Sequence, residues 1–160
     1  MIKTRNDLSP ATRSKVIALL NARLADAVDL ASHAKAAHWN VKGPSFIALH
    51  KLFDDTHATV SEMVDDIAER AVALGGVAHG TARAAAAESS LKEYPTDLAD
   101  GTDHCAALAD RLAHFGKLAR KAIDDADKLG DAGTADLFTG VSRDCDKILW
   151  FVEAHLQAQA

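Results

Sequence analysis

Residues 45–74 read SFIALHKLFDDTHATVSEMVDDIAERAVAL, and this stretch decides the fold class because its apolar residues recur at three- and four-residue steps. They form one stripe, which consists of Phe46, Leu49, Phe53, Val60, Ile67, Ala71 and Leu74. The stretch follows a proline and ends at Gly75-Gly76, as expected on either side of a helix. The pattern therefore predicts a long amphipathic helix.

Helices of similar length are expected on both sides of this stretch. The first begins at Ser9-Pro10, because serine caps helices well and proline suits the first helical position, and it extends to about residue 38. The last follows a turn at residues 130–133, where two glycines flank Asp131-Ala132.

The longest connection, at residues 75–95, lies in the middle of the chain. Its alanine run at 82–87 predicts a short extra helix. After Pro95 the apolar pattern restarts at Thr96 or Asp97 and predicts the third long helix. Two short connections and one long one between four helices predict an all-α fold, a four-helix bundle with a crossover in the middle.

The composition is that of one globular domain. The chain has 160 residues, of which 48% are hydrophobic and 26% charged, and we expect a single domain over residues 1–160 with a short tail at 1–8. No run of about eighteen apolar residues predicts a membrane span, and the start MIKTRNDLSP lacks an apolar signal core. Cys105 and Cys145 lie in helical patterns, which favours reduced thiols and a cytoplasmic protein.

A second stripe on residues 45–74 is polar and lies beside the apolar one. Its members are His50, Asp54, His57, Ser61, Asp65 and Glu69. Most charged stripes are solvated surfaces, and that is one interpretation. The other is a metal site, because the acidic residues of this stripe have no lysine or arginine four residues later. His50 and Asp54 also offer a nitrogen and an oxygen ligand on adjacent turns.

The spacing predicts two half-sites in each chain. Asp54 and Asp65 are eleven residues apart, about 16 Å along a helix, so one ion cannot contact both within a chain. Two copies of this helix, packed antiparallel about a two-fold axis near residues 59–60, would bring the half-sites of opposite chains together. His38 lies beside the start of this helix and is expected to complete the first half-site. The expected ligands, which suit Fe(II), Mn or Zn, are His38, His50 and Asp54 from one chain with Asp65 and Glu69 from the other.

Two motifs resemble the signatures of a known family. HWNVKG at 38–43, followed by Leu49-His50 and Asp54, resembles the first signature of the Dps family, the ferritin-like mini-ferritins that protect bacterial DNA in starvation. VDDIAER at 64–70, followed by Leu74-Gly75, resembles the second. The similarity continues to SRDCDKILWF at 142–151 and covers nearly the whole chain.

The resemblance implies a ferritin-like four-helix bundle with a short extra helix in the middle connection, assembled into a hollow dodecamer. It also implies a catalytic ferroxidase site across each dimer two-fold axis, where two iron ions bind to His38, His50, Asp54, Asp65 and Glu69. The substrates would be Fe(II) and hydrogen peroxide, the latter as the favoured oxidant. The ferric product would be stored as a mineral, which would protect DNA from oxidative damage.

The resemblance also implies roles for three other residues, Trp39, Asp136 and Asp131, and the spacing suggests one for His57. Trp39 would intercept stray oxidising equivalents, with packing at an interface as the alternative. His57 would be an accessory group near the site. Asp136, and more weakly Asp131, would line the three-fold pores through which iron enters, and a place at a helix start is the alternative for both.

DNA binding is expected to be weak or absent, although many family members bind DNA through lysine-rich tails. This chain has a formal net charge of −5, offers only Lys3 and Arg5 before Asn6-Asp7, and has no positive charge in residues 157–160. A protein that condenses DNA in the nucleoid, with secondary iron oxidation, is the alternative function. A helical scaffold without chemistry, whose polar stripe is only solvated, is a third.

Overall fold

The computed structural model describes residues 1–157. These residues contain five helices. They are α1 (Pro10–Asn40), α2 (Phe46–Ala73), α3 (Ala82–Glu88), α4 (Gly101–Lys128) and α5 (Ala132–Gln157). The all-α prediction is confirmed, and the short helix predicted in the alanine run is α3. Residues 158–160, part of the uncharged C-terminal stretch, lie outside the described residues.

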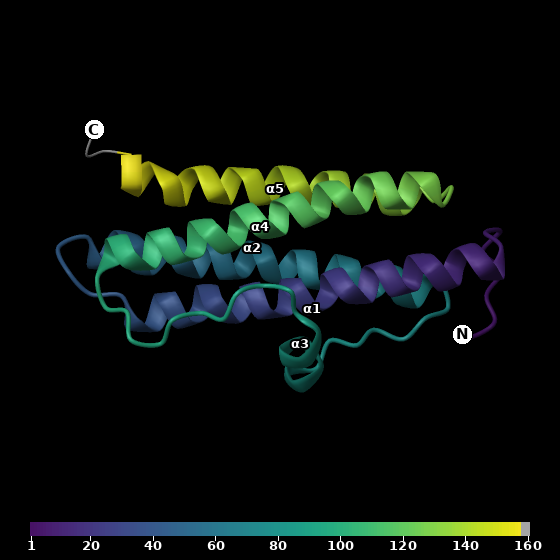
Figure 1. The fold of residues 1–160 in the computed structure, drawn as a ribbon, viewed down its shortest axis with the longest axis horizontal. Coiled ribbons are helices and arrows are strands. Elements are labelled where there is room, and N and C mark those ends of the chain that lie inside the picture. Colours follow the sequence, from purple (N-terminus) through teal and green to yellow (C-terminus); the bar gives the residue numbers. More distant parts are fainter. Residues whose placement is uncertain (158–160) are drawn as a thin grey trace.

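The four long helices form a bundle of two antiparallel pairs (Figure 1). α1 packs on α2, and α4 packs on α5. The connection that carries α3 returns along the bundle, so α2 and α4 run parallel, as the predicted crossover requires. Figure 1 also shows that α3 projects from the side of α1, outside the bundle.

Local sequence signals set the ends of the long helices. The side chain of Ser9 accepts a hydrogen bond from the amide of Thr12 and caps α1. Gly75, with φ at +86°, ends α2 in a Schellman motif, in which the amide of Gly76 donates to the carbonyl of Ala71 at 2.9 Å. These ends agree with the breakers expected from the sequence.

The start of α4 differs from the sequence prediction. The helix begins at Gly101, with Asp100 as its cap, and not at Thr96 or Asp97. The amide of Lys42 donates to the carbonyl of Ala99 at 2.8 Å, so this part of the connection bonds to the α1–α2 turn instead of to a helix. Local sequence patterns could not predict this contact, because its two residues are 57 positions apart in the sequence.

One apolar core runs between the four long helices. Its largest fully buried side chains include Phe53, Phe115 and Phe138, and both cysteines are buried with free thiols. The N-terminal segment also lies against the bundle, because the amide of Ile2 donates to the carbonyl of Gly75 at 2.7 Å. Among the described residues, no helix has the length and apolar character needed to span a membrane.

Candidate metal centre

Two histidines meet where the end of α1 lies against the start of α2. The Nδ1–H of His38 donates to the backbone carbonyl of His50 at 2.7 Å, and the Nδ1–H of His50 donates to the carbonyl of His38 at 2.9 Å. Their rings stack with centroids 3.8 Å apart. The two hydrogen bonds cross between the helices, so each helix fixes the ring carried by the other.

These hydrogen bonds decide which nitrogen each ring can offer to a metal. A carbonyl oxygen only accepts hydrogen bonds, so Nδ1 carries the proton in both neutral rings. The lone pair therefore lies on Nε2 of His38 and of His50. Histidine ligands of metals usually donate their other ring N–H to a carbonyl or carboxylate in this way, which fixes ring orientation. The pair is arranged as two oriented nitrogen ligands.

Asp54 completes a cluster with the two histidines. Its Oδ1 lies 4.0 Å from Nδ1 of His38, one helical turn beyond His50 on α2. The same oxygen pairs with the ammonium of Lys35 on α1. The hydrogen bond and charge of Lys35, with smaller contributions from His38 and His57, outweigh desolvation and hold the pKa of Asp54 below its ordinary value. The carboxylate is thus ionised and already paired with a cation of the chain itself.

His57 lies one turn further along α2, on the same side. Its Nδ1–H donates to the carbonyl of Ala31 at 2.9 Å, which leaves Nε2 as the free nitrogen, as in the other two histidines. Its ring is close enough to Asp54 that a positive charge on the ring would lower the pKa of that carboxyl. The predicted accessory histidine is therefore adjacent to the cluster, half-buried, with a free ring nitrogen.

Asp65 and Glu69 are exposed on α2, about three and four turns beyond Asp54 respectively. Neither makes an ion pair within residues 1–157. In the same range, no group of three or more His, Cys, Asp or Glu side chains could hold a metal ion within one protomer. A protomer thus carries two stacked histidines with Asp54 near His38, and a separate pair of carboxylates, and neither set meets the requirements of a metal site on its own.

The remaining predicted residues differ in their surroundings. Trp39 is 69% exposed, next to His38, and Asp136 is exposed on α5. Asp131 is buried, caps α5 through the amide of Thr134, and pairs with Arg70 at 2.7 Å. Burial would raise the pKa of Asp131, but the hydrogen bonds from Thr134 and the charge of Arg70 outweigh burial and lower the pKa. The helix-start alternative therefore accounts for Asp131, while Asp136 remains the pore candidate.

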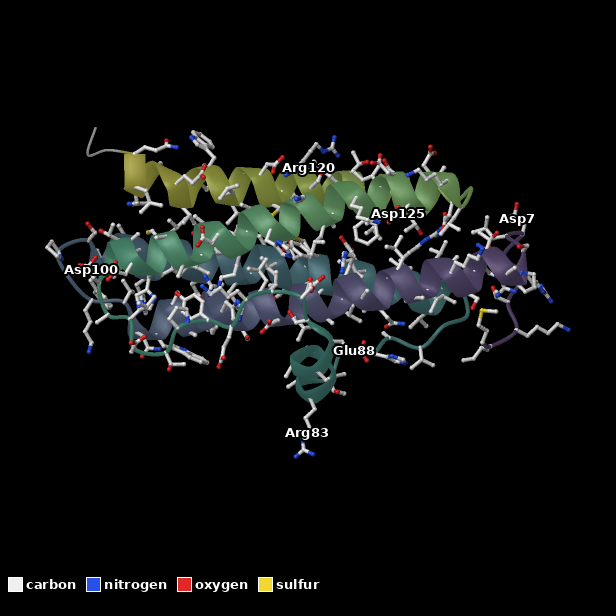
Figure 2. The ribbon with its side chains drawn as sticks, in the orientation of Figure 1. Asp7, Arg83, Glu88, Asp100, Arg120 and Asp125 are labelled. Carbon is white, nitrogen blue, oxygen red and sulfur yellow. The ribbon has the colours of Figure 1, made fainter. Side chains whose placement is uncertain are left out.

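Figure 2 shows the side chains that surround the bundle.

Lys35 was not singled out in the sequence, although it contacts the candidate ligand Asp54 directly. It lies three residues before His38, and residues three apart share a face of a helix. Once His38 is a candidate ligand, that spacing is the signal that points to Lys35.

Comparisons with known proteins agree on the class of fold. The ferritin-like domain family matches residues 17–159. The DNA protection during starvation protein of Agrobacterium fabrum is 49% identical over 158 residues, which are 99% of this chain and 98% of the relative. The solved structure of DpsA14 from Streptomyces coelicolor is 39% identical, with a TM-score of 0.91, over 96% of this chain and 90% of that one.

A third similarity concerns the kind of site. A Dps protein from Vibrio cholerae, described as a member of a broad superfamily of ferritin-like diiron-carboxylate proteins, is 25% identical with a TM-score of 0.90, over 98% of each chain. The fold is that of a ferritin-like protein. The chain belongs to the Dps family.

Proposed function

We propose that this protein is a ferroxidase and an iron store, which oxidises Fe(II), preferably with hydrogen peroxide, and keeps the ferric product as a mineral. The observation that carries the proposal is the crossed pair of hydrogen bonds that fixes the rings of His38 and His50 and leaves Nε2 of each free, with the Asp54 carboxylate 4.0 Å from the His38 ring. Such a preorganised set of nitrogen and carboxylate ligands suits Fe(II) as a substrate. Removal of iron and peroxide together would protect DNA.

We propose that the complete site forms between two copies of the chain. His38, His50 and Asp54 of one copy would meet Asp65 and Glu69 of the other, and two-fold symmetry would give two such sites per dimer. Exposed apolar side chains surround the first half-site in support of an interface, namely Trp39, Phe46 and Ile47. Phe46 lies against His50, with ring centroids 5.0 Å apart.

The carboxylates explain why iron bound at this site would be oxidised. Hard anionic oxygens stabilise Fe(III) more than Fe(II), so a site with three carboxylates promotes loss of an electron from bound iron. Two irons in one shared site supply the two electrons that reduce one peroxide molecule to water. This two-electron step avoids release of hydroxyl radical.

Fe(II) and peroxide, mixed anaerobically in a stopped-flow instrument, test the activity. We expect rapid growth of ferric absorbance in the wild type and loss of the rapid phase in the double variant His50→Ala/Asp65→Asn. Asp66→Asn is the matched control, because it removes the same charge one residue along α2 and should keep the rapid phase. Unchanged kinetics in the double variant would contradict the assignment of the ligands.

Mixing the two single variants tests whether the site is shared. After dissociation and reassembly of His50→Ala with Asp65→Asn, half of the dimers are mixed, and each mixed dimer has one intact site. Rapid oxidation should therefore return to about a quarter of the wild-type amplitude. A site within one chain would show no recovery, and this outcome would refute the intersubunit arrangement.

Storage of a mineral core requires a hollow assembly, and we propose the dodecamer that the family resemblance implies. Asp136 would line the pores through which Fe(II) enters, since its exposed carboxylate is free to meet a cation. Native mass spectrometry tests the assembly, and a mass of twelve chains is the expected result. A stable dimer without larger species would remove the storage role and leave only the oxidation.

A further inference from the structure

We propose that Tyr94 and His104 form a proton-coupled electron donor that quenches one-electron oxidants generated at the iron site. This inference rests on the proposed function and adds a protective activity to it. It concerns a buried cluster outside the candidate ligands, in which the connection between α3 and α4 lies against α1 and α4 (Figure 1).

A short hydrogen bond joins the two side chains in the core. The hydroxyl of Tyr94 lies 2.7 Å from Nδ1 of His104, and both residues are buried, with His104 only 1% exposed. Burial lowers the pKa of His104, while the Leu98 carbonyl and the charges of Asp103 and Asp100 act in the opposite direction. At neutral pH the imidazole is uncharged, so Nδ1 is an acceptor for the phenol proton.

The surroundings of Tyr94 favour oxidation only if the proton leaves with the electron. Burial raises the pKa of Tyr94, so the phenol is not deprotonated beforehand. The guanidinium of Arg111 lies 5.5 Å from the centre of the Tyr94 ring. A nearby positive charge disfavours a cationic ring, which is the product of electron loss without proton loss. Transfer of the proton to His104 removes this obstacle.

Packed aromatic rings link the pair to the helices that carry the candidate ligands. The ring of Phe53, the residue before Asp54, lies 6.2 Å from that of His104. On the other side, the ring of His33 lies 5.2 Å from that of Tyr94. His33 precedes His38 by five residues on α1, about 7.5 Å of helix rise. Tyr94 and His104 therefore pack against residues of α1 and α2, the two helices that carry the candidate ligands.

The oxidant is the hydroxyl radical that forms when peroxide meets a single Fe(II). Tyr94 loses one electron, and its hydroxyl proton moves to Nδ1 of His104. The electron reduces the hydroxyl radical to hydroxide, which takes a proton from solvent and becomes water. A further Fe(II) then reduces the phenoxyl radical and becomes Fe(III), while the proton returns from His104 to the phenol oxygen. The pair is thereby restored.

Any tyrosyl radical can be assigned to Tyr94, because Tyr94 is the one tyrosine of the chain. Electron paramagnetic resonance (EPR) of samples frozen after mixing with peroxide and less Fe(II) than fills the sites should show a tyrosyl radical. Ring-deuterated tyrosine should change its hyperfine pattern, and Tyr94→Phe should abolish the signal. In Tyr94→Phe, a spin trap in solution should also capture more hydroxyl radical than in the wild type.

A second variant tests the role of His104. High-field EPR should give a lower gx value in the wild type than in His104→Gln, because a hydrogen bond from the imidazolium to the phenoxyl oxygen lowers gx. His114→Gln, an exposed histidine on the same helix, is the matched control and should leave gx unchanged. Equal gx values in the wild type and His104→Gln would overturn the role of His104 as proton acceptor.

The outcomes separate this inference from the proposed function. Ferric absorbance that rises without any tyrosyl signal would overturn the inference and leave the ferroxidase standing. Absence of iron oxidation in the wild type would overturn both. A tyrosyl signal that is lost in Tyr94→Phe, with unchanged ferric formation at full iron loading, would support both.

Discussion

At the scale of single residues, Lys35 is an internal competitor for the metal. Its ammonium pairs with the Asp54 carboxylate that an arriving Fe(II) would bind. We expect Lys35→Met to bind divalent metal more tightly, by up to about fivefold, because an exposed ion pair competes only weakly with a metal. Calorimetric titration with Zn(II), which is not oxidised, measures this change.

The control for that experiment is Lys35→Arg. It keeps the charge and the reach to Asp54, so its affinity for Zn(II) should stay close to that of the wild type. Weaker binding by Lys35→Met would show that Lys35 supports the site instead of competing for it.

The proximity of part of the candidate site could be predicted from sequence, but the tautomers of its histidines could not. His38, His50 and Asp54 were expected to lie together, and they do. The stripe on α2 predicted the place of Asp65 and Glu69, whose ligand role remains a prediction. The tautomers of His38 and His50 could not be predicted, because they depend on backbone carbonyls across a helix interface, and no pattern of side chains records those.

At the scale of elements, the start of α5 depends on Asp131. Its carboxylate caps the helix at Thr134 and holds Arg70 of α2. Asp131→Ala should lower the free energy of unfolding by about 1–3 kcal/mol, because a cap is lost and a half-buried guanidinium loses its partner. Urea unfolding at fixed protein concentration measures the effect, and Asp136→Ala, an exposed aspartate on the same helix, should change it little.

The same residue gives a pH dependence with a defined sign. The pKa of folded Asp131 lies below its ordinary value of 3.8. Its contribution to stability is therefore complete above that value and is lost as the pH falls through the lower folded value. Asp131→Ala should show a smaller loss of stability in this acid range than the wild type.

The connection before α4 should loosen in mild acid. Burial lowers the pKa of both His33 and His104 from an ordinary value of 6.5. The neutral forms are favoured in the fold, so stability is complete above 6.5 and falls as the pH drops toward the lowered values. The protection factors of residues 89–100, which are the intrinsic exchange rates divided by the observed ones, should fall below about pH 6.5. Protection factors that stay constant down to pH 5 would contradict this expectation.

Elements with periodic sequences were predictable, and the connection was not. The four long helices and α3 follow from apolar spacing, caps and breakers such as Gly75. The segment before α4 was expected to be helical from Thr96 or Asp97, but it is irregular, and its Ala99 carbonyl accepts a hydrogen bond from the amide of Lys42 instead of joining a helix. Only tertiary structure brings those two segments together, so local helix propensity could not predict where α4 begins.

At the scale of the whole molecule, charge argues against tight DNA binding. A dodecamer would carry about −60 by multiplication of the formal charge of −5. The few cations near the N-terminus adjoin a segment that is bonded to Gly75 through Ile2. A gel shift at about 0.15 M salt should show no stable complex, whereas weak binding can appear at low salt. Tight binding at 0.15 M would favour the nucleoid role instead.

The exposure of both tryptophans determines what the intrinsic fluorescence of this protein reports. Trp39 and Trp150 are 69% and 62% exposed in a single protomer, and no tryptophan lies in the core. The indole emission of an isolated chain therefore reports on water at the surface, and unfolding should shift it only slightly. Association that covers Trp39 should move the emission to shorter wavelength. In this molecule, fluorescence is a measure of assembly, while folding has to be followed by circular dichroism.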